Sequence, residues 1–252
     1  MEGAAPAEHA FTSSLRHRLY AGFLNLPYII ICFVGFLAMG LGSIGLFVLF
    51  IGQITVVPIL VTILQMITDA IDGITGRSLF HMSAADDASI NRVIPAAADG
   101  NDNTGPTYWT AHMTFFFGYL LANAVSIKSI PADPLVDKKH TNNRMLRTTW
   151  IIIATVLFAL MFPLLRFRLT GGRFVDNTSF IGRLLGGVTG GAETMAGILL
   201  ALIVCGGIGY AWYQFAESCG ARSADVFGIA QQMLAPTAKD DTPMACVYSP
   251  KP

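Results

Sequence analysis

The feature that most constrains this chain is one apolar run, which extends from Ala21 to Asp69 with no charged residue before Asp69. As a single helix, at about 1.5 Å per residue, it would be roughly 70 Å long, more than twice the hydrocarbon thickness of a bilayer. The run must therefore fold back on itself. The stretch Gly40–Gly45 holds three glycines, which lower helix propensity. The sequence predicts a helical hairpin that reverses there.

The composition favours a membrane protein. Hydrophobic residues make up 53% of the chain and charged residues 13%, whereas a soluble domain carries about 25% charged residues. Lys plus Arg balances Asp plus Glu at 16 each, so the overall charge does not indicate a nucleic-acid partner. The fold class that we expect is all-α: a polytopic transmembrane helical bundle of about five spans.

Polar or glycine-rich stretches separate the predicted transmembrane spans, and each of the three tryptophans falls at a proposed span end, where aromatic rings favour the membrane interface. The expected spans cover residues 22–39, 45–69, 108–130, 149–165 and 192–214 of the transmembrane domain 21–214. The remaining segments are a polar N-terminal tail, 1–20, a polar segment, 70–107, a basic loop, 131–148, a glycine-rich connector, 169–191, and a C-terminal tail, 215–252. The N-terminal tail is not expected to be a cleavable signal, because the apolar stretch after it is too long.

Five spans place the two termini on opposite sides of the membrane. Lys and Arg then divide eight to each side, so the positive-inside rule gives no orientation.

Polar residues recur along one side of two predicted spans. His112, Tyr119, Asn123 and Ser126 are spaced by about one or two helical turns, and Thr55, Thr62, Gln65 and Asp69 form a second stripe in the hairpin. Polar side chains inside a span can line a conduction path, or they can hydrogen-bond neighbouring helices. Because no charged residue joins the stripe of span 108–130 in mid-span, we favour interhelical hydrogen bonding over a pore.

An enzymatic alternative comes from Asp69-Ala-Ile-Asp72-Gly73-Ile-Thr-Gly76-Arg77. This stretch resembles the first half of the motif of CDP-alcohol phosphatidyltransferases, in which carboxylates hold a divalent metal. The second half of that motif would place Gly and two Asp at positions that here hold Asp86, Ile90 and Ile94. We therefore expect no catalytic residue, no metal site and no cofactor.

Two further segments are candidates for contacts. Overlapping small-residue pairs at four-residue spacing, which permit close helix packing, are Gly186 with Gly190 and Gly187 with Gly191. In the C-terminal tail, residues 223–234 predict a short amphipathic helix whose docking face includes Val226, Phe227 and Met233. Asn177-Thr-Ser179 matches a glycosylation sequon weakly. Cys32 and Cys205 are interpreted as buried packing residues.

Three pieces of the sequence resemble one family. They are Tyr108-Trp-x-x-His112 with Phe115-Phe-Phe-Gly-Tyr119 and Asn123, then Asn142-Asn-Arg144, and finally Gly209-Tyr-x-Trp-Tyr213 with Cys219-Gly-Ala-Arg-x-Ala-Asp225-Val-Phe-Gly-Ile229. The family consists of polytopic membrane proteins carried by large nucleocytoplasmic DNA viruses of algae and protists. The resemblance covers a little over half of the chain. It implies a protein of the internal virion membrane beneath an icosahedral capsid, and it implies no catalytic residues.

The sequence is thus expected to encode a structural integral membrane protein of a virion inner membrane, which helps to link membrane and capsid. Its expected partners are membrane lipids, capsid or minor capsid proteins and other membrane subunits, and no nucleic acid. A subunit of a membrane channel or transporter is the first alternative, and a lipid enzyme with a degenerate motif is the second.

Overall fold

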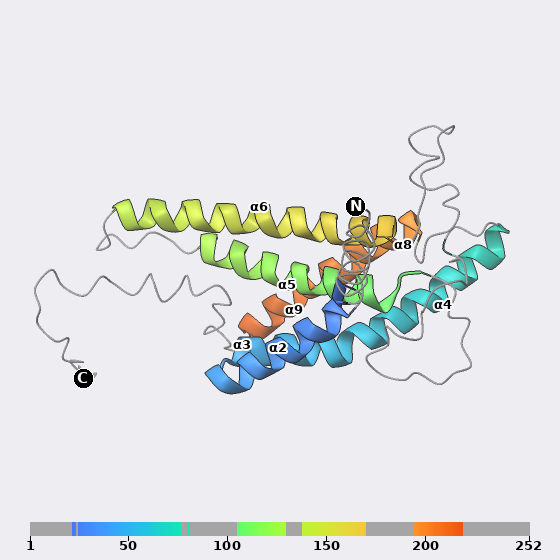
Figure 1. The fold of residues 1–252 in the computed structure, drawn as a ribbon, viewed down its shortest axis with the longest axis horizontal. Coiled ribbons are helices and arrows are strands. Elements are labelled where there is room, and N and C mark those ends of the chain that lie inside the picture. The colour runs from blue at the N-terminus through green and yellow to red at the C-terminus, as the bar shows by residue number, and fades with distance from the viewer. Residues whose placement is uncertain are drawn as a thin grey trace, which may run out of the picture.

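The structure is a computed structural model that describes residues 22–23, 25–76, 80, 105–129, 138–169 and 194–218, with side chains except at 138–141, 144 and 167–169. Within these residues the fold is all-helical, with five continuous helices (Figure 1). Three of them are single elements: α2 (Leu26–Leu41), α5 (Tyr108–Ser129) and α6 (Lys138–Leu169). The other two each contain a π-helical turn. In one, η1 (Gly52–Val56) joins α3 (Ile44–Ile51) to α4 (Val57–Thr75), and in the other, η2 (Ala201–Cys205) joins α8 (Met195–Leu200) to α9 (Gly206–Ser218). Successive helices alternate in direction, so the bundle is antiparallel.

The hairpin reverses at Gly42–Ser43, within the stretch where the sequence places the break. Gly42 ends α2 in the left-handed region, with φ +61°, a conformation that glycine adopts without steric cost. Ser43 begins α3, because its side-chain oxygen accepts a hydrogen bond from Leu46 N at 3.4 Å. A Cβ at Gly35 would lie within 2.7 Å of the Phe50 ring, so the two arms pack closely.

The π-helical turn η1 lies directly before Pro58. Proline has no backbone N–H, and its ring clashes with the carbonyl four residues earlier in a regular α-helix. In η1 the Val57 N–H instead donates to the Gly52 carbonyl, five residues back, which lets the helix continue past Pro58. Pro58 therefore causes a local change of helical register, and α3, η1 and α4 form one helix of 32 residues.

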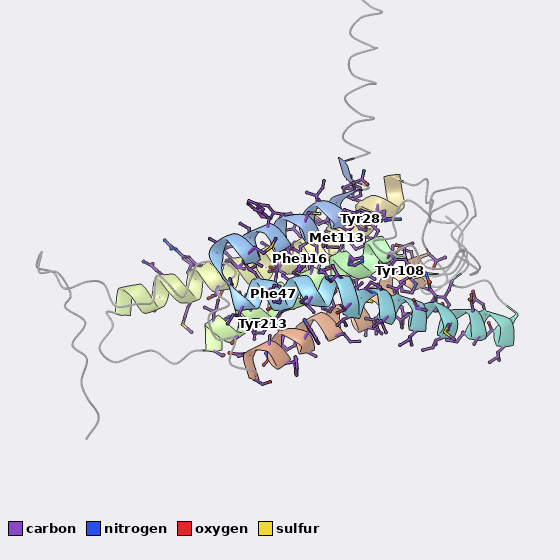
Figure 2. The ribbon with its side chains drawn as sticks, turned by 90° about the horizontal axis from the view of Figure 1, so that it is seen from below. Tyr28, Phe47, Tyr108, Met113, Phe116 and Tyr213 are labelled. Carbon is purple, nitrogen blue, oxygen red and sulfur yellow. The ribbon has the colours of Figure 1, made fainter. Side chains whose placement is uncertain are left out.

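Helix α5 lies at the centre of the bundle. Its residues from Tyr108 to Phe115 are all buried, as are most of those that follow to Ile127. One side packs against α6 and the start of α2 through Trp109, Met113 and Phe117, and another packs against α3, α4 and α9 (Figure 2). We predicted one protein-facing stripe on this helix, whereas protein surrounds nearly all of it.

The helices extend past the ends of two predicted spans, and the prediction of a loop at 138–148 is wrong. The second apolar helix continues past residue 69 to Thr75. The predicted loop 131–148 is helical from Lys138 onward, and α6 continues through Pro163 to Leu169 instead of ending near 165. The physical reason is that the change from apolar to polar residues marks a membrane boundary, not a helix end. No glycine or proline occurs between Lys138 and Phe162 to stop the helix.

The outer surface of the described bundle is largely apolar. Large exposed side chains include Phe33, Phe36 and Met39 on α2, and Leu157, Leu160 and Met161 on α6. Cys32 is also exposed on α2, so our interpretation of it as a buried packing residue is wrong, whereas Cys205 is buried. By length and composition, three helical stretches could cross a membrane: Ile44–Thr75, Met145–Arg166 and Met195–Ser218. Helix α2 is apolar but shorter, at 16 residues. These features are consistent with membrane integration.

Candidate functional site

The buried polar centre of the bundle is a pair formed by His112 of α5 and Gln53 of η1. His112 Nδ1 lies 2.6 Å from Gln53 Oε1, and Gln53 Nε2 donates to the His112 backbone carbonyl at 3.2 Å. The second bond identifies Gln53 Oε1 as the acceptor oxygen of the amide. His112 Nδ1 therefore carries the imidazole proton, and His112 Nε2 is an acceptor. Both side chains are essentially inaccessible to solvent, and His112 Nε2 makes no hydrogen bond in the described structure.

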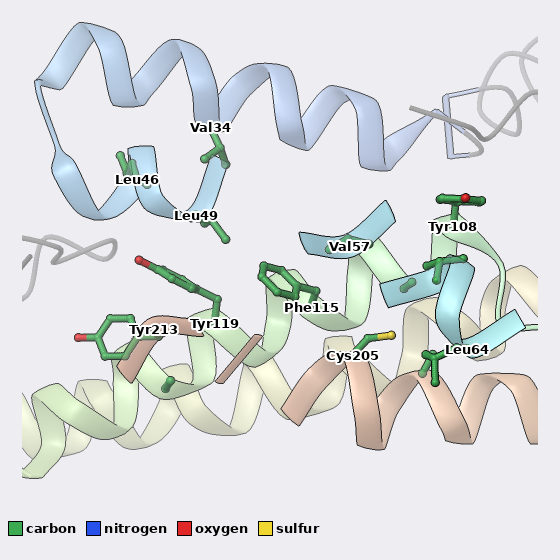
Figure 3. Close-up of a cluster of buried hydrophobic side chains, with 14 of the residues drawn as sticks. Val34, Leu46, Leu49, Val57, Leu64, Tyr108, Phe115, Tyr119, Cys205 and Tyr213 are labelled. Carbon is green, nitrogen blue, oxygen red and sulfur yellow. The ribbon is translucent and has the colours of Figure 1, made fainter. Parts of the chain in front are cut away.

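The polar residues nearer the C-terminal end of α5 bind α3 and α9. Tyr119 donates its hydroxyl to the Gly45 carbonyl at 2.8 Å, and its ring meets Tyr213 edge-on with centroids 5.2 Å apart (Figure 3). Asn123 Nδ2 donates to the Tyr213 hydroxyl at 3.3 Å. Ser126 Oγ donates to the Glu217 carboxylate at 2.9 Å. The predicted stripe on α5 therefore lies between helices.

The second predicted stripe, on α4, contacts the start of α5. Gln65 Nε2 donates to the Pro106 carbonyl at 3.3 Å, and the Thr62 hydroxyl lies 3.5 Å from that of Tyr108. Thr68 was not in the predicted stripe, yet its hydroxyl is within 3.0 Å of the Gly105 carbonyl. Thr55 does not belong to the stripe, because it is exposed and its hydroxyl bonds the Ile51 carbonyl of its own helix.

The acidic segment at the end of α4 organises the backbone that leads into α5. The Asp72 carboxylate accepts a hydrogen bond from Phe80 N at 3.0 Å, and the Phe80 carbonyl accepts one from Gly105 N at 2.8 Å. Asp72 thus connects the end of α4 to the residues just before α5. In the described residues no three His, Cys, Asp or Glu side chains cluster as metal ligands. Arg77 and the rest of the resembling motif to Ile94 lie outside the described residues.

Helices α5 and α9 approach closely where both carry glycine. A Cβ at Gly118 would overlap the Gly206 carbonyl oxygen, and one at Gly209 would overlap the Phe115 carbonyl oxygen. Small residues at such crossings let two backbones meet. The glycines that we predicted for helix packing, 186, 187, 190 and 191, lie outside the described residues, as do the docking helix 223–234 and the sequon at 177–179.

Two tryptophans are held between helices instead of lying freely at the interface. Trp109 is fully buried, and its indole N–H donates to the Phe23 carbonyl at 3.1 Å. The Arg166 guanidinium lies 4.9 Å from the Trp109 ring centroid, in cation–π geometry. The Trp212 indole N–H donates to the Val48 carbonyl at 2.9 Å. The indole ring lies so close to Gly52 that a Cβ there would overlap it. Only Trp150 of the three is largely exposed.

Sequence reasoning missed Gln53 as a site residue. In a regular helix, at about 100° per residue, Gln53 and Gln65 would lie roughly 120° apart. The π-helical turn adds one residue to a turn. The directions of Gln53 and Gln65 around the helix axis therefore differ by only about 20°, and both side chains face α5 or the residues just before it. The one sequence signal of this change of register was Pro58. A proline inside an apolar run predicts a local disturbance of the helix but gives no indication of its form.

Comparison of the chain with known protein families, with curated proteins and with solved structures gives no match.

The close contact of α5 with α9 yields the first testable prediction. Gly118→Val should destabilise the protein by about 1–3 kcal/mol, because the added side chain overlaps the Gly206 backbone, which can yield only if the helices separate. Reversible unfolding in bicelles measures this loss. Gly207→Val is the matched control, because a Cβ there meets nothing within 4 Å. Equal stability of the two variants would contradict the close crossing.

The His112–Gln53 pair yields the second. His112→Leu and Gln53→Leu should each cost about 1–3 kcal/mol, since each leaves a buried polar partner unsatisfied. The double variant should cost clearly less than the sum of the two, because it removes both groups. The control cycle pairs Gln53→Leu with Asn123→Leu, whose hydrogen-bond partner is Tyr213, and should be additive. Additivity in the first cycle would show that the two side chains do not interact.

Proposed function

We propose that this chain is a structural protein of the inner membrane of a large DNA virus, which crosses that membrane five times and helps to attach it to the capsid. The observation that carries the proposal is the use of the polar residues. The side chains of the predicted stripe on α5 bond groups of α3, η1 and α9, and Gln65 of α4 bonds the backbone just before α5. Such a set of bonds holds helices together.

The five-span topology is supported by the alternating directions of the helices and by the position of α5. Helix α5 is less apolar than its neighbours, because it carries the polar residues that the neighbours cover. A central helix of 22 residues, about 33 Å, is long enough to cross the hydrocarbon core, provided that other helices shield its polar face. Five crossings put the start of α2 and the end of α9 on opposite sides.

The virion assignment rests on the family resemblance. Residues that carry the resemblance meet in the bundle: Gly209 packs on Phe115, and Tyr213 contacts both Tyr119 and Asn123. These residues contribute to helix packing, which is the role that a membrane scaffold needs. Attachment to the capsid is assigned to the predicted amphipathic helix 223–234, which lies outside the described residues.

Particle incorporation tests the proposed role. Phe227→Asp should lower the amount of this chain in purified virions, because it places a charge in the predicted apolar docking face. Quantitative mass spectrometry of particles, against the amount in infected-cell membranes, measures the effect. Gln232→Asp, on the polar face, is the matched control and should incorporate normally. Normal incorporation of the Phe227 variant, or absence of the wild-type chain from particles, would contradict the proposal.

A channel or transporter subunit is the second candidate, and it is favoured by the buried His112 Nε2 acceptor at the centre of the bundle. Against it, the polar stripe of α5 is interrupted between His112 and Tyr119, where Phe115 is buried in the apolar core. Conduction requires a continuous path of polar groups or water.

Proton flux separates the two candidates. Vesicles that contain the protein and a pH-sensitive dye should respond to an external acid pulse no faster than empty vesicles, because the polar stripe is closed by interhelical bonds. Vesicles with gramicidin serve as the positive control. Faster flux that is lost in His112→Leu would support the channel and contradict the scaffold.

A further inference from the structure

The last turns of α4 project past the rest of the bundle. Figures 1 and 2 both show this end of α4 extending beyond the neighbouring helices, on the side where α5 begins. The helix Ile44–Thr75 has 32 residues and is therefore about 48 Å long, whereas the hydrocarbon core of a bilayer is about 30 Å thick. Part of α4 must lie at or beyond the membrane boundary, even when the helix is tilted.

Contacts with α5 locate that boundary along α4. The first charged residue of the run is Asp69, and Thr68 bonds the Gly105 carbonyl in the non-helical segment before α5. The non-helical residues just before α5 are covered by protein, but Asp69 is partly exposed, and a carboxylate that protein does not cover is costly in hydrocarbon. Residues 69–75 rise about 10 Å beyond this level, which is comparable to the headgroup zone of about 5–8 Å on each side of a bilayer.

The projecting turns are amphipathic. Their polar side, with Gln65, Thr68 and Asp72, is already bound to Pro106, Gly105 and Phe80. Their opposite side is apolar and exposed, from Met66 and Ile67 through Ile71 to Ile74, which is 86% exposed. This stripe continues that of Ile59 and Ile63, on the same helix, which face hydrocarbon if α4 spans the membrane.

We propose that the apolar stripe Ile67–Ile71–Ile74 is a membrane-interface anchor, which lies in the boundary between lipid headgroups and acyl chains and fixes the tilt and depth of α4. The occupant is lipid for two reasons. The stripe is continuous with the spanning surface of α4, and its length beyond Thr68 is comparable to the thickness of the headgroup zone. Residues 64–76 contain two Asp and no Lys or Arg, and Arg77 follows, so within these turns the contact with lipid is apolar.

The anchor differs from the docking element of the proposed function. It lies at the end of the bundle where α5 begins, whereas the residues that follow Ser218 continue from α9 at the opposite end. The inference depends on the membrane insertion that the proposed function assumes, but not on the virion or on the capsid. Loss of the anchor should change the tilt of α4 without abolishing insertion, because the remaining spanning surfaces are untouched.

Spin-label accessibility of the full chain in phosphatidylcholine nanodiscs tests the anchor. Cys32, Cys219 and Cys246 are replaced by Ala, the buried Cys205 is kept, and a nitroxide is placed at Ile59→Cys, Ile71→Cys, Ile74→Cys or Gly73→Cys. Collisions with oxygen report lipid, and collisions with a water-soluble nickel complex report water. We expect labels 71 and 74 to favour oxygen at shallower depth than label 59, whereas label 73 favours nickel.

Two results would overturn the anchor. Nickel accessibility at 71 and 74 equal to that at 73 would place the stripe in water. Exclusion of both reagents at 71 and 74 would mean that protein, such as a second copy of the chain, covers the stripe. The label at residue 59 tests the membrane assignment by itself. If that label were exposed to water, α4 would not span the membrane, whichever result labels 71 and 74 gave.

Discussion

The bundle depends on one constraint: a polar group in a membrane interior must find its hydrogen-bond partner inside the protein, and of the two ring nitrogens of His112 only Nδ1 does so. Lipid offers no donor or acceptor, so an unpaired amide, hydroxyl or imidazole in hydrocarbon carries the full cost of its lost hydration. Four polar side chains of α5 bond another helix, whereas the buried Thr114 hydroxyl bonds carbonyls of α5 itself. The same constraint explains why the outer surface is apolar, since lipid solvates isoleucine and phenylalanine well. The interhelical polar bonds therefore help to specify which helices meet, and the exposed apolar side chains mark the surfaces that do not contact other described helices.

The π-helical turns adjust that arrangement. In η1 the extra residue brings Gln53 to the same side as Gln65, and it lets the helix pass Pro58 without a broken end. In η2 the Gly206 N–H donates to the Ala201 carbonyl, five residues back, immediately before the Gly206 backbone that Gly118 meets. Both turns pack against α5 close to Phe115. A change of helical register thus occurs where the central helix needs a particular side chain or a close backbone approach.

The sequence was sufficient for the helical class, for the reversal near Gly42 and for the inward stripe of His112, Tyr119 and Asn123. Each of these follows from a periodicity or from a length set against bilayer thickness. It was not sufficient for the helix ends, because Lys138–Thr148 and Asp69–Thr75 are helical although their polarity predicts a loop. It also failed at Gln53 and at Gly118. The first depends on a register shift that α-helical periodicity cannot represent, and the second depends on which helix α5 packs against, a tertiary choice.

The central claim is that α5 is a protein-enclosed helix whose polar side chains join the bundle together inside a bilayer. A cryo-electron microscopy map of the protein in lipid nanodiscs tests this most directly. The account predicts ordered acyl chains against Phe33, Phe36 and Leu157, direct contact of His112 with Gln53 and of Asn123 with Tyr213, and no lipid against α5. A map in which acyl chains touch the polar side of α5, or in which a water-filled passage runs past His112, would contradict it.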